Sequence, residues 1–249
     1  MAQGPYRRPP IIEAVIEVRF ATAIDERDLA AVSRALGKWY PGEQILSSTQ
    51  FLFEVPAGVP AAPPTPQVAA GSPAYRRASL DQTEILLAMP GSFAVSQLAD
   101  YPGWAVFFAR FQRDWEERKR VVGYCKITRV GVRYINRLDL AATGPVVSYE
   151  DYLCFYAQTP EELGPTVAYG AQAVFQSTAV GGRITVNSGV VTSPIEQHLS
   201  IMLDIDVYRE NDLPQKDDDL FRLLESFRTE KNRVFEACIT DRARELFRQ

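Results

Sequence analysis

Three arginines spaced four residues apart form the most regular charged pattern in the sequence. Arg129, Arg133 and Arg137, here called the arginine stripe, lie in a segment that is predicted to be a strand at 125–140. In a strand, residues four apart point to the same side, so neighbouring guanidinium groups would be about 13 Å apart on one face. Such a row can bind a phosphate backbone or another polyanion.

A second predicted strand, at 11–20, offers a different explanation for the stripe. Glu13 and Glu17 have the same four-residue spacing and lie on the polar face of that strand. If the two strands pair, these carboxylates face the arginines, and the stripe becomes a self-neutralised lattice of ion pairs. We favour this structural lattice and keep anion or nucleic-acid binding by the stripe as the alternative.

A pair of carboxylates is the second candidate for chemistry. Asp204 and Asp206 would lie about 7 Å apart on one face of a strand at 196–209, a spacing that suits a shared divalent cation or acid–base work. Two carboxylates supply too few oxygens to hold magnesium or calcium alone. A solvated or arginine-paired face is therefore favoured over a metal site.

The other catalytic signatures that we sought are missing from the sequence. It contains one histidine, His198, without a serine motif that could complete a triad, and it has no glycine loop of the phosphate-binding or dinucleotide-binding kind. We therefore expect no cofactor. A row of aromatic residues at helical spacing predicts core packing rather than a ligand site: Trp104, Phe107, Phe108, Phe111 and Trp115.

Strands and helices alternate along the first half of the chain, residues 1–145. Hydrophobic periodicity predicts strands at 11–20, 44–55, 75–99 and 125–140, and helices after Asp25 and at 103–122. A proline-rich stretch at 56–73 is interpreted as a loop insertion. This order resembles a ferredoxin-like split βαβ unit with an antiparallel sheet.

The second half, residues 146–249, is predicted to be rich in strands and to end in a long helix. The strands are expected at 149–158, 167–178, 182–192 and 196–209, and the helix begins at Asp217. Together the halves predict an α+β fold, with antiparallel sheets covered by amphipathic helices in one compact unit.

The long C-terminal helix has a predicted buried stripe and a charged side. The charged residues expected to face water are Arg222, Glu225, Arg228, Glu230, Lys231, Arg233, Glu236 and Arg242. A long terminal helix can also mediate dimerisation. Docking of this helix on another protein would instead require an exposed apolar patch at Phe227, Val234 and Phe235.

Composition limits the class of protein. The chain has 249 residues, a net charge of −4, a pI near 5.3 and 46% hydrophobic residues. These values are typical of a folded globular protein, and no apolar run is long enough to span a bilayer. The acidic pI argues against a generally basic nucleic-acid-binding surface. Three scattered cysteines, without a secretory signal, favour the cytoplasm.

Four segments resemble, in order, a sporadically distributed prokaryotic family of similar length that has no assigned activity. They are residues 9–20, the strand Gly131-Val132-Arg133-Tyr134-Ile135-Asn136-Arg137-Leu138-Asp139, residues 203–208 and residues 235–241. The resemblance spans nearly the whole chain, and the proline-rich stretch is an addition to it. It implies an accessory or defence-associated role, and it draws attention to Arg133, Asn136, Arg137 and Asp204.

The leading hypothesis is a cytoplasmic, non-catalytic binding or interaction protein. Its recognition surface would be the polar strand faces, with Glu13, Glu17, Asn136 and the arginine stripe. The alternative is an enzyme that acts on a phosphorylated or nucleotide substrate, with the stripe holding phosphate and Asp204 and Asp206 serving as metal ligands or as acid and base. The expected partners are another protein, a second copy of the chain or an anionic ligand, and not a membrane.

Overall fold

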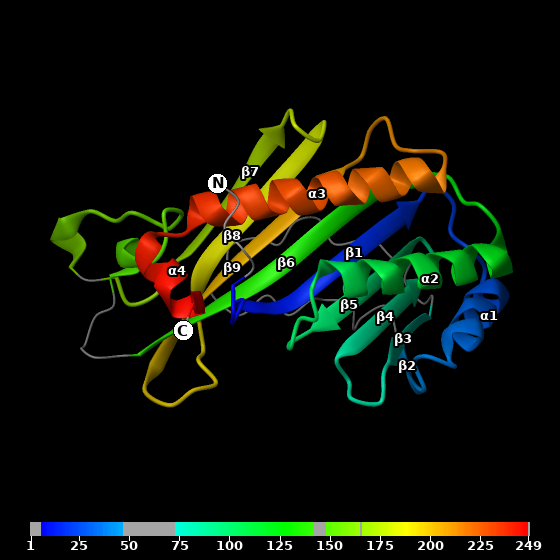
Figure 1. Ribbon diagram of the computed structural model, residues 1–249, viewed down its shortest axis with the longest axis horizontal. Helices are drawn as coiled ribbons and strands as arrows, with labels where there is room; N and C mark the ends of the chain where they lie inside the picture. Colours follow the sequence, from blue (N-terminus) through cyan, green and yellow to red (C-terminus); the bar gives the residue numbers. More distant parts are fainter. Residues whose placement is uncertain (1–5, 47–72, 142–147, 165, 249) are drawn as a thin grey trace.

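One antiparallel sheet joins the two halves of the chain (Figure 1). The computed structural model describes residues 6–46, 73–141, 148–164 and 166–248. Within these ranges, nine strands pair in the order β2-β3-β4-β5-β1-β6-β9-β8-β7. They are β1 (Ile11–Phe20), β2 (Gly42–Leu46), β3 (Ala74–Ala78), β4 (Glu84–Met89), β5 (Ser92–Leu98), β6 (Ile127–Ala141), β7 (Gly170–Ser177), β8 (Gly182–Val191) and β9 (His198–Arg209).

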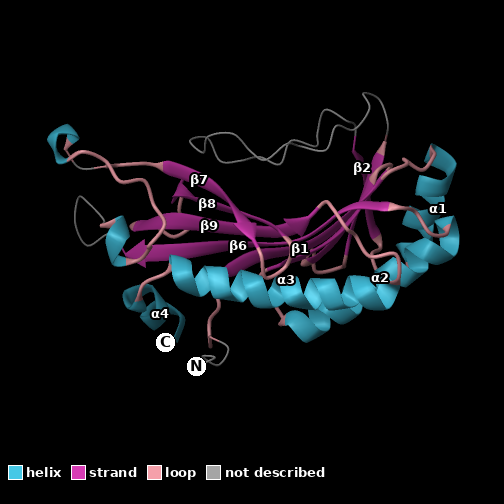
Figure 2. Ribbon diagram, turned by 90° about the horizontal axis from the view of Figure 1, so that it is seen from above, coloured by secondary structure: helices cyan, strands magenta, loops and turns pink. Residues whose placement is uncertain are grey.

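The α-helices of the described chain all lie on one face of this sheet (Figure 2). They are α1 (Glu26–Leu36), α2 (Trp104–Val122), α3 (Asp217–Cys238) and α4 (Asp241–Arg248). None of the helices in the described ranges is both long and apolar enough to cross a membrane. The predicted α+β class is confirmed. We call the sheet face that carries the helices the helix face, and the opposite one the polar face.

The two halves share a plan around the central pair of strands. Beyond β1 lie β5, β4 and β3, and beyond β6 lie β9, β8 and β7. The last strand of each meander leads into a long helix, α2 after β5 and α3 after β9. The pairing of the first strand with the long central strand, on which the ion-pair lattice depends, is present, because β1 and β6 are antiparallel neighbours. The ferredoxin-like arrangement is not confirmed, because four described strands, rather than two, separate α1 from α2.

Alternation along the strands sends one side of each into the core. On β1, Ala14, Ile16 and Val18 are fully buried on the helix face. The aromatic row of α2 packs there as predicted, with Phe107 and Phe111 also fully buried. On α3, the residues that a protein-docking patch would expose are buried instead: Phe227, Val234 and Phe235. The docking hypothesis for this patch is therefore wrong, because the patch is part of the buried core of its own chain.

The segment at 149–158 is not a strand: Tyr149–Asp151 is a 3₁₀ turn, and the segment contributes one isolated bridge, Leu153 to Ile239. A tight turn at Gly181 joins β7 to β8, and a Cβ on the next residue, Gly182, would meet the Tyr208 carbonyl oxygen at 2.2 Å. All but the last residue of the proline-rich stretch at 56–73 lies outside the described residues.

Candidate functional site

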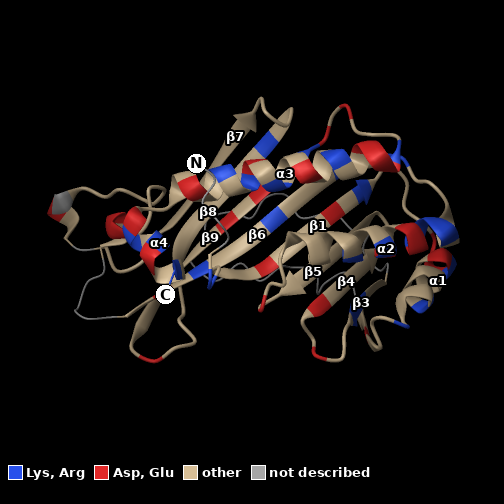
Figure 3. Cartoon of the chain, in the orientation of Figure 1, with Lys and Arg blue, Asp and Glu red and all other residues tan. Residues whose placement is uncertain are grey.

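The arginine stripe lies on the polar face, where acidic and basic positions adjoin on β1, β6 and β9 (Figure 3). Arg129 donates to Glu17 Oε2 and to Asp206 Oδ2, both at 2.6 Å. Arg133 makes a bidentate pair with Asp204, with both hydrogen bonds at 2.8 Å. The stripe arginines thus meet carboxylates from two neighbouring strands.

The pairing differs in part from the expected lattice. Glu17 does contact Arg129, but Glu13 accepts a hydrogen bond from Ser96 Oγ at 2.5 Å. Arg137 pairs with Asp139 of its own strand at 2.9 and 3.1 Å. In the strand register, the β1 positions directly opposite Arg129 and Arg133 are Arg19 and Val15, so neither arginine has a carboxylate directly across on β1, and Glu17 reaches Arg129 diagonally.

Both members of the carboxylate pair are engaged by the lattice. Asp204, 1% exposed, also accepts a hydrogen bond from Asn187 Nδ2 at 2.9 Å. Burial raises the pKa of Asp206, although the Arg129 and Arg133 guanidinium groups oppose this rise. Burial alone would lower the pKa of Arg133, but the Asp204 carboxylate outweighs it and the pKa is raised. No cluster of three or more metal-ligating side chains occurs within the described ranges.

A large cavity lies on the helix face, on the other side of the same central strands. Its volume is about 910 Å³, within the range of small-molecule sites. The N-terminal segment, the loop that enters α2, β6 and α3 form its wall. Its aromatic lining consists of Tyr6, Tyr101, Trp104, Tyr134 and Phe235, and its charged lining consists of Arg7, Arg228, Lys231, Arg233, Arg244 and Glu236.

Lys231 is the most unusual group in this cavity. It extends from α3, is 8% exposed, and holds its Nζ 3.7 Å from the centroid of the Tyr134 ring. No described carboxylate forms an ion pair with it. Burial and, secondly, the neighbouring Arg228 guanidinium lower the pKa of Lys231 to about 7. The sequence-based assignment of Lys231 to the water-facing side of the helix is wrong, and so is that of Glu230, which is 5% exposed.

Hydroxyl groups on the cavity wall keep their protons at neutral pH. Tyr101 and Tyr134 share a hydrogen bond of 2.7 Å between their hydroxyl oxygens. Burial raises the pKa of Tyr101 to about 12 and also raises that of Tyr134. Beside Tyr134 on β6, the buried Asn136 lines the cavity and donates to the Leu203 carbonyl at 3.0 Å.

The basic residues of the lining differ in how far they are neutralised. Arg244 donates to Glu236 Oε2 at 2.9 Å, and Glu236 also accepts the Tyr6 hydroxyl at 2.6 Å, so that carboxylate is fully engaged. Arg233 is paired with Glu230, which does not line the cavity. Lys231 has no acidic partner among the described residues. The N-terminus of α2 opens into the same space, and no side chain caps it.

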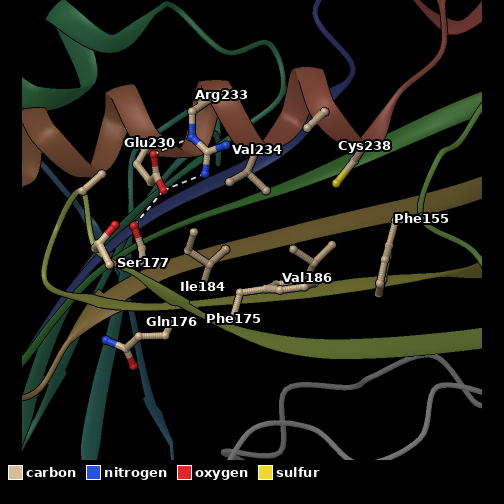
Figure 4. Close-up of a pocket in the computed structure, with 13 residues that line it drawn as sticks. Phe155, Phe175, Gln176, Ser177, Ile184, Val186, Glu230, Arg233, Val234 and Cys238 are labelled. Atoms are coloured by element: carbon tan, nitrogen blue, oxygen red, sulfur yellow. Dashed lines mark hydrogen bonds and ion pairs between the residues drawn. The ribbon is translucent and has the colours of Figure 1, made fainter.

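A second, smaller cavity lies between α3 and the outer strands β7 and β8 (Figure 4). Its volume is about 460 Å³. The only acid on its wall within the described chain, Glu230, accepts hydrogen bonds from Ser177 at 2.7 Å and from Nε and Nη2 of Arg233 at 2.8 and 2.9 Å. Because these polar groups satisfy one another, this cavity is a weaker candidate than the one at Lys231.

Sequence reasoning missed the cavity, although a signal for it was present. The buried stripe of α3 recurs at intervals of four and three residues, and Lys231 occupies one of its positions, four after Phe227 and three before Val234. A lysine at a core position of an amphipathic helix indicates a buried amine. Of the predicted site residues, Asn136 alone lines the cavity in the described structure, whereas Glu13, Glu17 and the arginine stripe lie on the polar face.

No protein-family model matches the chain, and no match was found among curated proteins. The resemblance seen in the sequence therefore stays a prediction.

Proposed function

We propose that the protein is a cytoplasmic, non-catalytic binding protein whose ligand is a small organic anion with an aromatic or apolar body. The ligand occupies the cavity between the N-terminal segment, the start of α2, β6 and α3. One observation supports this most: Lys231 is buried in a cavity of about 910 Å³ without an acidic partner among the described residues.

The physical argument starts from the cost of burial. A buried cation without a counter-ion destabilises the folded protein, and an anionic ligand that supplies this charge removes the cost. Attraction between opposite charges is also stronger in a partly desolvated cavity than in water. The uncapped N-terminus of α2 adds amide donors that favour the same sign of ligand. The aromatic lining suits an apolar ligand body.

The polar face has less support as a ligand site. Each arginine of the stripe already contacts a carboxylate, so a ligand would have to displace an internal partner. We assign the lattice a structural role. The enzyme alternative also has less support, because Asp204 and Asp206 accept hydrogen bonds from these arginines. The cytoplasmic location is supported by the free state of Cys125, Cys154 and Cys238.

The test is a thermal-shift and calorimetry screen with phenyl phosphate and benzoate, using benzyl alcohol as the neutral control. An anion at about 100 times its Kd should stabilise the protein by roughly 2.7 kcal/mol. We expect the stabilisation to disappear in Lys231→Met and to persist in Lys126→Met, because Lys126 is exposed. Equal stabilisation of both variants, or none of the wild type by either anion, would refute the site.

A further inference from the structure

We propose that Lys231 is a nucleophile that captures the carbonyl group of an anionic aldehyde or keto acid as a Schiff base. The proposal deepens the function above and rests on the same cavity. It follows from the placement of a primary amine on the face of Tyr134, inside a basic cavity that is large enough to enclose an organic anion. A lysine that is desolvated and next to another cation is the arrangement that activates amines toward carbonyl groups.

The first requirement is a free amine. An ordinary lysine is almost wholly protonated at neutral pH and cannot attack a carbonyl carbon. With a pKa of about 7, roughly half of Lys231 is unprotonated at that pH.

The groups that line the cavity around Lys231 act in both directions on the pKa of its amine. On β6 these are Tyr134 and Asn136, on the loop that enters α2 it is Tyr101, and on α3 they are Arg228 and Glu236. Glu236, which also pairs with Tyr6 and Arg244, raises the pKa of Lys231, but its effect is smaller than those of burial and Arg228. The positive charge of Arg228 lowers the pKa of Lys231 and so favours the free amine.

The second requirement is a place for the rest of the ligand. Arg7 and Arg228 line the same cavity, Arg228 with a long contact of 3.4 Å to Glu225 at the surface, and the N-terminus of α2 opens into it. If these groups hold the anionic end of the ligand, its carbonyl end is free to reach Lys231. The attack of the amine on the carbonyl carbon then takes place within one complex.

The reaction balances without an oxidant or a reductant. The lone pair of Lys231 Nζ forms a bond to the carbonyl carbon, and one N–H proton moves to the carbonyl oxygen to give a carbinolamine. The C–O bond then breaks, and the hydroxyl group leaves as water with the remaining N–H proton. The product is a C=N bond and one water molecule. The hydroxyl groups of Tyr101 and Tyr134 on the cavity wall are protonated at neutral pH. This pair can donate a hydrogen bond to the oxygen of the ligand carbonyl group.

The experiment uses pyridoxal 5′-phosphate as an anionic aldehyde, at an amount equal to that of the full-length protein. Borohydride reduces any Schiff base to a stable secondary amine, and peptide mass spectrometry locates it. We expect labelling of Lys231 to exceed that of Lys126 by roughly tenfold or more, because far more of its amine is free. Labelling of Lys231 should reach half of its maximum near pH 7.

Two comparisons separate this proposal from the binding function. Pyridoxine 5′-phosphate has the same anionic group but no carbonyl, so calorimetry with it measures binding alone. Binding that depends on Lys231, with adducts spread over Lys38, Lys126 and Lys216, would overturn the Schiff base and retain the anion site. Absence of binding by either compound would overturn both. In Lys231→Arg the adduct should disappear while pyridoxine 5′-phosphate still binds.

Discussion

Replacing Lys231 by methionine should make the protein more stable, by an amount that depends on pH. Methionine has a similar length and no charge. The pKa of Lys231 is about 7 in the folded protein, against an ordinary value of 10.5 in the unfolded chain. Between these values the unfolded chain binds a proton that the folded protein does not, so the free energy of unfolding of the wild type rises with pH.

The size of the effect follows from this difference in pKa. The penalty for burying the amine is fully present below pH 7 and is lost as the pH approaches 10.5. It should be roughly 4 kcal/mol at about pH 7.5 and roughly 1 kcal/mol at about pH 9.5. The advantage of Lys231→Met over the wild type should therefore fall by roughly 2 to 3 kcal/mol across that interval. Any change in packing is independent of pH and does not alter this slope.

Urea denaturation across this pH range measures the effect directly. Subtracting the wild-type curve from the variant curve removes the other titrating groups, which both proteins share. Lys126→Met is the matched control, since its amine is exposed and its curve should run parallel to that of the wild type. If the curve of Lys231→Met were also parallel, the amine would have an ordinary pKa, and the reasoning about both ligand binding and nucleophilicity would fail.

Other predictions concern the lattice and the turns. Arg129→Met removes the cation from buried carboxylates and should cost roughly 3 to 5 kcal/mol in chemical denaturation, whereas Arg137→Met, at a partly exposed pair, should cost roughly 0 to 1 kcal/mol. Equal losses of stability in the two variants would contradict the expectation that the buried ion pairs of the lattice matter more than the partly exposed one. Gly182→Ala should lower stability by roughly 1 to 3 kcal/mol through its clash with Tyr208, while Gly91→Ala, which has open space, should leave the melting temperature unchanged.

Local patterns predicted the elements better than their arrangement. The alternation in Ile11–Phe20 defines β1 from end to end, and the aromatic spacing defines α2 to within a residue at its start. These two predictions succeed because the spacing of apolar residues, which shows the face that is buried, can be read from a short stretch of sequence. The segment at 149–158 fails because a strand also needs a partner. Its apolar side chains belong to the hydrophobic core, but among the described residues its main chain makes a single isolated β-bridge, from Leu153 to Ile239.

The lattice shows the same limit at the level of single contacts. The sequence indicated that carboxylates would face the arginine stripe, and Glu17 does so. It also favoured a solvated or arginine-paired face for Asp204 and Asp206, but it could not indicate that β9 would be the second neighbour of β6 and would bring these two carboxylates to the stripe. Partner choice between distant strands depends on the whole sheet, so the pairing of Arg133 with Asp204 was beyond the reach of spacing arguments.

The two faces of β6 differ in whether their cations have internal carboxylate partners, and this difference supports the site that we propose on the helix face. Because side chains alternate, Arg133 and Arg137 lie on the polar face while Tyr134 and Asn136 lie on the helix face. On the polar face each cation of the stripe has an internal carboxylate, so its charge is already satisfied. On the helix face, Lys231 is left without one among the described residues. Since a buried cation of this kind destabilises the free protein, a compensating ligand explains its presence better than packing does.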